Sequence, residues 1–306
     1  MQDFSGKIAV ITGGGTGMGR ELARQLTAEG CDVAICDIST EAMQACAEAC
    51  ATNAAQGVRM TSFQCDVANP QEMEAFADQV RTEFATDHIN LLFNNAGIAG
   101  GGSFIHETQT AWEKTFDVCW GGVYNGSRAF MDLLVASNEG HIVNTSSING
   151  IWASAGPNAA HTAYSAAKYA VKGFTEALIT DLRINAPHVK ASVVMPGHIG
   201  TSILLNTGTH AAAGRAVLKM MGTDDARLTE TQVQETVQAA GEAFRDNAPT
   251  TAAEAARVIL DGVKAEKWRI LIGNDAISLD ELVRSDPENV YEADFPSRWA
   301  AARATD

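Results

Sequence analysis

The sequence predicts an α/β protein built on a mostly parallel sheet with helices on both faces. Short apolar runs alternate with longer amphipathic segments from residue 7 to about residue 273. That alternation is typical of parallel strands joined by covering helices. A glycine-rich turn also lies between the first apolar run and the first helical segment, where α/β proteins commonly bind phosphate groups.

Seven apolar runs are predicted as strands, because each is short and bounded by turn or helix signals. They are residues 7–12, 33–38, 58–67, 88–95, 141–147, 189–197 and 268–273. Longer amphipathic segments between and beside them are predicted as helices. These are residues 17–30, 40–55, 70–84, 110–136, 163–185 and 251–265. Pro70 opens the third helix, at a first-turn position that tolerates proline.

Residues 202–250 interrupt this alternation and are too long for a simple connection in a compact domain. We predict that they form a lid or substrate-binding segment within a single catalytic domain spanning residues 1–306. The tail, residues 280–306, is polar, with Phe295 and Trp299 as candidate anchors. Its composition leaves open whether the tail is docked or frayed.

Composition narrows the functional classes. The 306 residues are 46% hydrophobic and 19% charged, as in soluble globular proteins. Acidic residues outnumber basic ones, 37 to 22, for a net charge of −15, which argues against nucleic-acid and membrane-surface partners.

No apolar segment reaches about 18 residues, the minimum for a membrane-spanning helix. The N-terminus lacks the features of a signal peptide. The six cysteines form no C-x-x-C pair, so we expect reduced thiols, no metal site and a cytoplasmic location.

The segment TGGGTGMG, residues 12–19, is predicted to bind a pyrophosphate. The spacing of Gly13, Gly17 and Gly19 differs from the G-x-G-x-x-G fingerprint. It suits the same physical task, because glycines allow a tight turn and let backbone N–H groups approach phosphate at a helix N-terminus.

Asp37 ends the second predicted strand, where a carboxylate can accept hydrogen bonds from an adenosine ribose. The same carboxylate would repel a 2′-phosphate, and no lysine or arginine stands at Thr16 or Ile38 to compensate. We therefore expect NAD to be preferred over NADP.

Tyr164 and Lys168 are four residues apart in a predicted helix and hence share a face. A free tyrosine has a pKa near 10, and a neighbouring ammonium lowers that pKa by stabilising the phenolate. Such a pair can exchange a proton with an alcohol or carbonyl oxygen. Ser146 and Ser147 end the fifth strand, at the sheet edge where open α/β proteins bind ligands. The fourth and sixth strands end at the same edge, in NNAG (94–97) and PGHIGT (196–201).

Together, TGGGTGMG, CDV (65–67), NNAG, the serine pair, YSAAK (164–168) and PGHIGT resemble the classical short-chain dehydrogenases/reductases, over residues 4 to about 275. This resemblance implies a Rossmann-like, doubly wound parallel sheet in the strand order 3-2-1-4-5-6-7. It also implies a nicotinamide cofactor and a homodimer or homotetramer built on the two long helices.

The resemblance assigns roles by position. Tyr164 resembles the catalytic acid/base, Lys168 the residue that lowers its pKa and holds the nicotinamide ribose, and Ser147 the serine that binds the substrate oxygen. Other positions match the family's glycine-rich loop, its contacts with the ribose and the adenine, and its segment that positions the nicotinamide. We expect NAD to be bound by Gly13, Thr16, Gly17, Met18, Gly19, Asp37, Asp66, Val67, Asn94, Ala96, Gly97, Tyr164, Lys168, Pro196, Gly197, Ile199 and Thr201.

Two features depart from the family pattern. Ser147 precedes Tyr164 by seventeen residues rather than about thirteen, with the extra residues assigned to 152–161, so Ser146 remains an alternative to Ser147. Cys119 stands where the family has an asparagine that helps hold a proton-relaying water behind the lysine. Cysteine is a weak hydrogen-bonding group. We expect it to be a tolerated replacement rather than a nucleophile, because no base is evident beside it.

The sequence thus predicts reversible NAD-dependent hydride transfer between a secondary alcohol and a ketone, with an apolar small-molecule substrate. One alternative is an NAD-dependent epimerase or dehydratase, although those enzymes usually carry a different glycine spacing and a larger C-terminal domain. Another is a non-catalytic NAD-binding regulator. Net turnover of the cofactor would separate the first prediction from both.

Overall fold

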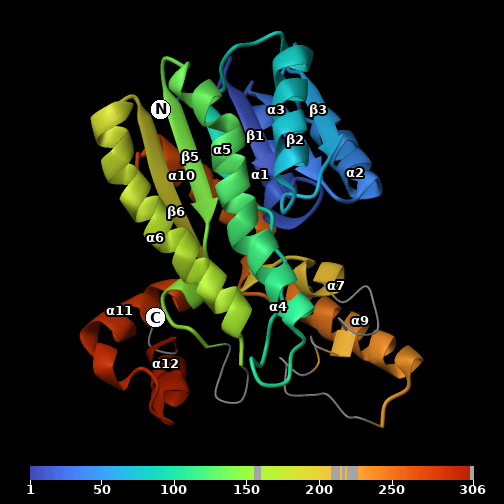
Figure 1. Cartoon of the computed structure of the whole chain (residues 1–306), viewed down its shortest axis with the longest axis vertical. Coiled ribbons are helices and arrows are strands. Elements are labelled where there is room, and N and C mark those ends of the chain that lie inside the picture. The colour runs from blue at the N-terminus through green and yellow to red at the C-terminus, as the bar shows by residue number, and fades with distance from the viewer. Residues whose placement is uncertain (155–159, 208–213, 216–217, 219–226, 304–306) are drawn as a thin grey trace.

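The computed structural model confirms the predicted α/β class. It describes residues 1–154, 160–207, 214–215, 218 and 227–303. In Figure 1 the sheet and its helices form the upper body, and the loops that follow the strands meet smaller helices below. The predicted segment 202–250 falls partly outside the described residues.

The main sheet has seven parallel strands in the order β3-β2-β1-β4-β5-β6-β9, which is the predicted topology. The strands are β1 Ile8–Thr12, β2 Asp32–Asp37, β3 Met60–Gln64, β4 Leu91–Asn94, β5 Gly140–Thr145, β6 Val189–Pro196 and β9 Arg269–Ile272. A second sheet, which the sequence did not predict, pairs β7 Ile199–Gly200 with β8 Thr250–Thr251. The central strands β1, β4 and β5 are buried along their whole length, as expected for a sheet covered on both faces.

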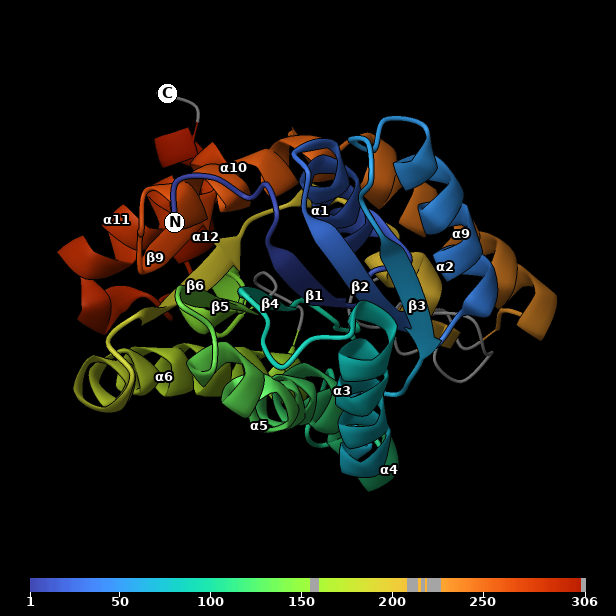
Figure 2. The same ribbon diagram turned by 90° about the horizontal axis from the view of Figure 1, so that it is seen from above.

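Helices cover the sheet in two layers (Figure 2). One layer contains α1 Gly17–Ala28, α2 Thr40–Ala51 and α10 Ala252–Lys264. The other contains α3 Pro70–Phe84, α5 Gly122–Val135 and α6 Thr162–Asn185. Each layer buries its own apolar cluster against one face of the sheet, and this burial is the main favourable contribution to folding. Pro70 lies in the first turn of α3, after Asn69 as the N-cap residue.

The predicted helix 110–136 is divided by a π-helical turn. Helix α4, Gln109–Phe116, leads into the π turn Asp117–Gly121 and then into α5. A Cβ atom at Gly122 would lie 2.6 Å from a methyl group of Val67, so the backbone approaches the loop after β3 closely here. Such single π turns commonly occur at functional sites, and this one contains Cys119.

The described parts of 202–250 fold over the loop that follows β4. They include α7 Ile203–Thr207 and α9 Glu230–Asp246. Leu204, Val233 and Val237 form a small apolar cluster with Ala99 of that loop. The Thr207 hydroxyl also accepts a hydrogen bond from the Ala99 amide at 2.9 Å.

The tail is docked, which answers the question that its composition left open. It comprises the end of α11 Asn274–Ser285, a 3₁₀ turn at Pro287–Asn289 and α12 Phe295–Arg303, at the lower left of Figure 1. Phe295 is fully buried, with its ring centroid 5.1 Å from that of Trp152. The Trp152 indole donates to the Val290 carbonyl at 2.8 Å. The tail therefore supports the segment that follows β5.

All six cysteines are buried free thiols. Within the described ranges, none of the helices combines the length and the apolar composition needed to cross a membrane.

Candidate active site

The predicted site residues gather at the carboxyl edge of the sheet, toward which the arrowheads of β5 and β6 point in Figure 1. The loops after β1, β2, β4, β5 and β6 all begin at this edge. The strand order reverses between β1 and β4, and such a reversal opens a crevice for ligands in doubly wound sheets.

The glycine loop connects β1 to α1 in a conformation that side chains would disrupt. Gly13 and Gly17 have φ values of +63° and +53°, in the left-handed region that favours glycine. A Cβ at Gly13 would lie 2.8 Å from the Ala96 Cα, and one at Gly19 would lie 2.1 Å from the Gly13 carbonyl oxygen. The loop is therefore a backbone cradle at a helix N-terminus, which suits a diphosphate.

Asp37 ends β2 beside this cradle. Its carboxylate accepts hydrogen bonds from the Gly15 amide at 3.0 Å and from the Ser39 amide at 3.2 Å. Thr16 is the N-cap residue of α1, and its hydroxyl accepts a hydrogen bond from the Asn206 amide group at 3.2 Å. Helix α7 thus reaches the glycine loop, and Thr201 lies against Gly17.

Several predicted cofactor residues have structural contacts of their own. The Asn94 side chain is buried and donates to Ser127 at 3.2 Å and to Asn144 at 2.8 Å, so it links β4 to β5 and α5. Asp66 is exposed near the start of the loop after β3, while the buried Val67 accepts a hydrogen bond from Asn125 through its carbonyl. The Met18 side chain packs against the apolar core.

The sequence did not single out two residues that join the loops after β1 and β4. The Thr12 hydroxyl accepts hydrogen bonds from the amides of Asn95 and Ala96, at 3.0 and 3.1 Å. The Asn95 side chain donates to the carbonyls of Thr12 and Gly13. Polar residues at the ends of neighbouring parallel strands were the available signal, because such strands end at the same edge.

Asp275, at the start of α11, holds the segment that contains Pro196, Gly197, Ile199 and Thr201. Its carboxylate accepts the His198 amide at 2.7 Å. A Cβ at Gly197 would lie 2.2 Å from the same carboxylate, so glycine is required for this approach. The sequence held no signal for the contact, because Asp275 follows His198 by 77 residues.

Ser147, Tyr164 and Lys168 come together where β5 meets α6. Tyr164 and Lys168 lie one turn apart on α6, with the ammonium nitrogen 5.3 Å from the centre of the phenol ring. The Ser147 hydroxyl lies close enough to Tyr164 to lower the pKa of the phenol, and it accepts the Asn149 amide at 3.1 Å. The Ser146 hydroxyl instead donates to the Lys168 carbonyl at 2.7 Å. The geometry therefore places Ser147, not Ser146, beside the phenol.

Burial controls the electrostatics of the pair. Burial raises the pKa of Tyr164, and the hydrogen bond from Ser147 opposes that rise. Burial also lowers the pKa of Lys168, whose ammonium group donates to the Thr145 carbonyl at 2.9 Å. A buried environment disfavours the charged form of either group. The pKa of Tyr164 is thus raised, whereas the sequence predicted that the neighbouring lysine would lower it; the effect of burial is the larger one. Tyr164 is therefore a neutral phenol at neutral pH, which is the form that can donate a proton.

Cys119 lies behind the lysine. A Cβ at Gly97 would be 3.7 Å from both the Cys119 sulfur and the Lys168 nitrogen, so the two side chains approach the same point. The thiol is fully buried and donates to the Ile98 carbonyl at 3.3 Å. Cys119 thus holds the loop after β4 through a single weak hydrogen bond.

His161 precedes α6 as its N-cap residue and lies against Tyr164. The two rings are stacked, with centroids 4.5 Å apart and planes within 8° of each other. Its side chain is buried, and burial lowers the pKa of His161 to about 4. Among the described residues, neither ring nitrogen has a hydrogen-bond partner.

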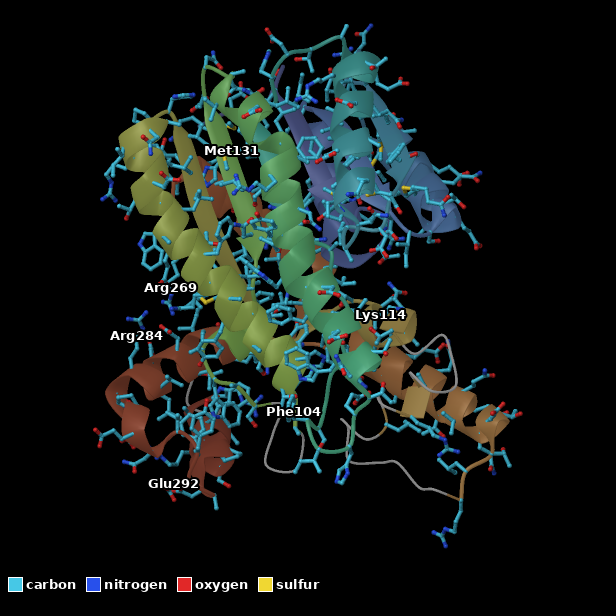
Figure 3. All side chains as sticks on the ribbon, in the orientation of Figure 1. Phe104, Lys114, Met131, Arg269, Arg284 and Glu292 are labelled. Atoms are coloured by element: carbon cyan, nitrogen blue, oxygen red, sulfur yellow. The ribbon has the colours of Figure 1, made fainter. Side chains whose placement is uncertain are left out.

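The loop of residues 101–108 borders the site on the side of α4. The carbonyls of Gly101 and Gly102 accept the amides of Ala163 and Thr162, so the loop is fixed to the first turn of α6. At its tip, Phe104 is 75% exposed and contacts the ring of Trp112. Figure 3 shows Phe104 near the lower ends of α4 and α6. An apolar surface therefore borders the site.

Comparisons with known proteins agree with this architecture. Residues 7–212 match the family model for short chain dehydrogenases. The chain is 35% identical over 285 residues to a Mycobacterium tuberculosis protein named "Putative oxidoreductase SadH", covering 93% of this chain and 92% of that protein. It is 35% identical over 196 residues to a 3-alpha-(or 20-beta)-hydroxysteroid dehydrogenase of Mycobacterium bovis, covering 64% and 70% of the two chains. A short chain dehydrogenase/reductase from Burkholderia phymatum, crystallised in complex with NAD, superposes with a TM-score of 0.76 at 27% identity, covering 94% and 96%.

The buried histidines predict a loss of stability in acid. Burial lowers the pKa of His161 to about 4 and that of His141 to about 3, whereas unfolded histidines titrate near about 6.5. Between these values the unfolded chain binds more protons, so the free energy of unfolding falls as the pH falls. The stability from each buried neutral histidine is fully present above about pH 6.5, and about 2 kcal/mol of it is lost by about pH 5.

Urea unfolding at about pH 7 and about pH 5 measures this loss. His161→Phe should reduce the difference, whereas His188→Phe, at the opposite end of the sheet, should leave it unchanged. An equal difference in the wild type and His161→Phe would contradict the assignment.

Proposed function

The chain belongs to the short-chain dehydrogenase/reductase family, and on that premise we propose that it catalyses reversible, NAD-dependent hydride transfer between a secondary alcohol and a ketone. The observation that carries this proposal is the convergence of Ser147, Tyr164 and Lys168 at the sheet edge that also bears the glycine loop. Proton-transfer groups and a phosphate cradle at one edge suit an enzyme that moves a hydride and a proton together.

The chain's own residues would handle the proton. In the direction of ketone reduction, the neutral Tyr164 phenol donates its proton to the substrate oxygen, and the Ser147 hydroxyl hydrogen bonds to the same oxygen. In the direction of oxidation, Tyr164 acts as the phenolate and takes the alcohol proton, which regenerates the phenol. The Lys168 ammonium, 5.3 Å from the phenol ring centre, stabilises the phenolate that reduction produces and oxidation consumes. NAD, when bound, accepts or supplies the hydride.

The residues of the cradle fit NAD. The backbone of Gly13, Gly17 and Gly19 leaves no room for side chains, and it would hold the diphosphate at the N-terminus of α1. Asp37 would accept hydrogen bonds from the adenosine ribose and repel a 2′-phosphate. The NAD complex of the Burkholderia phymatum relative supports this assignment.

We propose an apolar substrate of moderate or large size. Phe104 and Trp112 border the site on one side, and the described parts of 202–250, which we propose as a lid, contribute Leu204 and Val233 nearby. The similarity to hydroxysteroid dehydrogenases supports a substrate of this kind.

A co-substrate screen tests the function. NADH formation should be observed with apolar secondary alcohols and NAD⁺, with NADP⁺ used at least about tenfold less well, because a like charge close to the 2′-phosphate costs more than about 1.4 kcal/mol. Asp37→Asn removes that charge but keeps a hydrogen-bond acceptor, and should reduce the preference.

Three results would contradict the proposal. NADP⁺ used equally well by the wild type would contradict the role of Asp37. Activity confined to charged or carrier-linked substrates would contradict the substrate class. Tight NAD binding without NADH formation would favour the non-catalytic alternative.

Tyr164→Phe should lower kcat by about 10²–10⁴, the usual contribution of a positioned acid or base. NAD binding should persist, because the glycine loop is untouched. Tyr124→Phe, on the exposed side of α5, is the matched control and should be active. Stopped-flow or steady-state NADH absorbance gives kcat, and retention of more than a tenth of wild-type activity in Tyr164→Phe would rule out its proposed role.

Cys119 is proposed as a tolerated replacement. Cys119→Ser should remain within about threefold of wild-type activity, because a hydroxyl can also donate to the Ile98 carbonyl. Loss of all activity with folding intact, judged by circular dichroism, would overturn this. Cys119→Asn is the sharper test, since a clear rise in kcat would show that the thiol limits proton relay from Lys168.

We also propose that the chain is a homodimer or homotetramer built on α5 and α6. These helices form an outer layer in Figure 2, and their exposed residues include Tyr124 and Ile184. Light scattering should give about two or four times the 32.3 kDa mass of one chain. A wild-type mass of one chain would be inconsistent with the proposal, and Tyr124→Asp should reduce the assembled fraction.

A further inference from the structure

His161 lies directly beside Tyr164, the residue proposed to exchange a proton with the substrate. It precedes Tyr164 by three residues at the start of α6, so the two side chains share one face of the helix. Their rings are parallel within 8° and 4.5 Å apart at the centroids. The imidazole is therefore stacked directly on the phenol that is proposed to meet the reacting oxygen of the substrate.

The hydrogen-bonding capacity of His161 is unused within the protein. Only 7% of its surface is exposed, and within the described part of the chain both ring nitrogens lack a partner. Other histidines that are not exposed have at least one partner: His141 Nε2 is 2.7 Å from the Ser192 hydroxyl, although its Nδ1 has none among the described residues, and His198 Nε2 is 2.7 Å from the Phe244 carbonyl. Leaving a buried polar group unpaired costs about 1–3 kcal/mol, and a group left unpaired in this way calls for an explanation.

Stacking alone does not explain the histidine. A phenylalanine at this position could stack on Tyr164 without leaving buried nitrogens unpaired. Two described polar side chains of this region are already used, because the Thr162 hydroxyl donates to Gly102 and the Asn149 amide group donates to Ser154 and Ser165. For the described part of the chain, this leaves a partner that arrives with the ligand.

We propose that His161 determines substrate specificity by hydrogen bonding to a second polar group of the substrate, a hydroxyl or carbonyl on a carbon next to the reacting one. This inference rests on the proposed hydride-transfer function, because it takes Tyr164 as the group that meets the reacting oxygen. The short distance between the two rings requires the two substrate oxygens to lie close together, as they do on neighbouring carbons.

The protonation state of the imidazole defines the kind of group it can bind. Burial lowers the pKa of His161 to about 4, so the ring is neutral at neutral pH. A neutral imidazole has one N–H donor and one acceptor nitrogen. It can therefore pair with an uncharged hydroxyl or carbonyl, and it offers no positive charge to a carboxylate. The preferred substrates are hydroxyketones, diketones and the corresponding diols, carried on an otherwise apolar skeleton.

Matched ketone pairs test this inference. The two members differ only in a hydroxyl on the carbon next to the carbonyl, as in cyclohexanone and its α-hydroxy derivative, with a bicyclic pair for larger size. The values of kcat/KM are measured with NADH for the wild type, His161→Phe and His161→Asn. His161→Phe keeps an aromatic ring over Tyr164 but removes both nitrogens. His161→Asn keeps a donor and an acceptor but removes the ring, and His188→Phe controls for loss of an imidazole elsewhere.

The wild type should favour the hydroxylated member by about tenfold or more, which corresponds to one net hydrogen bond. His161→Phe should abolish this preference while changing kcat/KM for the plain ketone by less than about threefold, and His161→Asn should retain part of it. An equal preference in the wild type and His161→Phe would overturn the inference. So would an equal loss on both members, which would indicate that His161 only positions Tyr164.

The inference and the proposed function fail in different ways. Absence of turnover with every pair contradicts hydride transfer, and the pairs are then compared by the shift in thermal unfolding temperature in the presence of NADH. A larger shift with the hydroxylated member that disappears in His161→Phe still supports the inference. A shift that is equal for both members, or that His161→Phe leaves unchanged, overturns it. Should His161→Phe fail to fold, His161→Asn and His161→Ala carry the same comparison.

Discussion

A buried ammonium group fixes the geometry of the whole site. Lys168 is only 2% exposed, and burying an ammonium costs several kcal/mol unless hydrogen bonds compensate. Its nitrogen donates to the carbonyl of Thr145, the last residue of β5, while Ser146 of the same strand end donates back to the Lys168 carbonyl. These two bonds run in opposite directions between one strand end and one helical turn. They set the position of α6 along the sheet, and with it the positions of Tyr164 and His161.

The sheet beneath this contact is itself held by polar side chains. Asn94 and Asn144 are paired in register between β4 and β5, and the Asn94 side-chain amide donates to the side-chain amide oxygen of Asn144. Asn144 donates to Thr175 on α6, while Asn94 also donates to Ser127 on α5. Buried amides in an otherwise apolar sheet are costly unless they are paired. Their pairing links α5 and α6, helices of the layer that carries the reacting groups, to strands β4 and β5.

The sequence predicted those parts of the molecule that depend on short-range patterns. Apolar periodicity found all seven main strands, and four-residue spacing on a helix brought Tyr164 and Lys168 together. The sequence left Ser146 as an alternative to Ser147 for the serine that binds the substrate oxygen, because adjacent residues at a strand end differ only in the direction in which their side chains point. The sequence also missed the π turn around Cys119, which is followed by the close approach of Gly122 to Val67. The sequence did not indicate the role of Asp275, because that role arises from its contact with His198, which is 77 residues away in the chain.

The same long-range packing explains why the chain tolerates its longer segment between Ser147 and Tyr164. Three consecutive residues after β5 are each tied to a distant element. Tyr169 donates to the Ile151 carbonyl, Trp152 donates to Val290, and the Ala153 amide donates to the hydroxyl of Tyr291. Two of these partners lie in the docked tail, beyond residue 212, where the match to the family model ends. The catalytic groups therefore lie on elements within the family match, whereas Trp152 and Ala153, which follow β5, are supported by a part of the chain outside that match. Such an arrangement allows the surroundings of the substrate to change without disturbing the contact between β5 and α6 on which proton transfer depends.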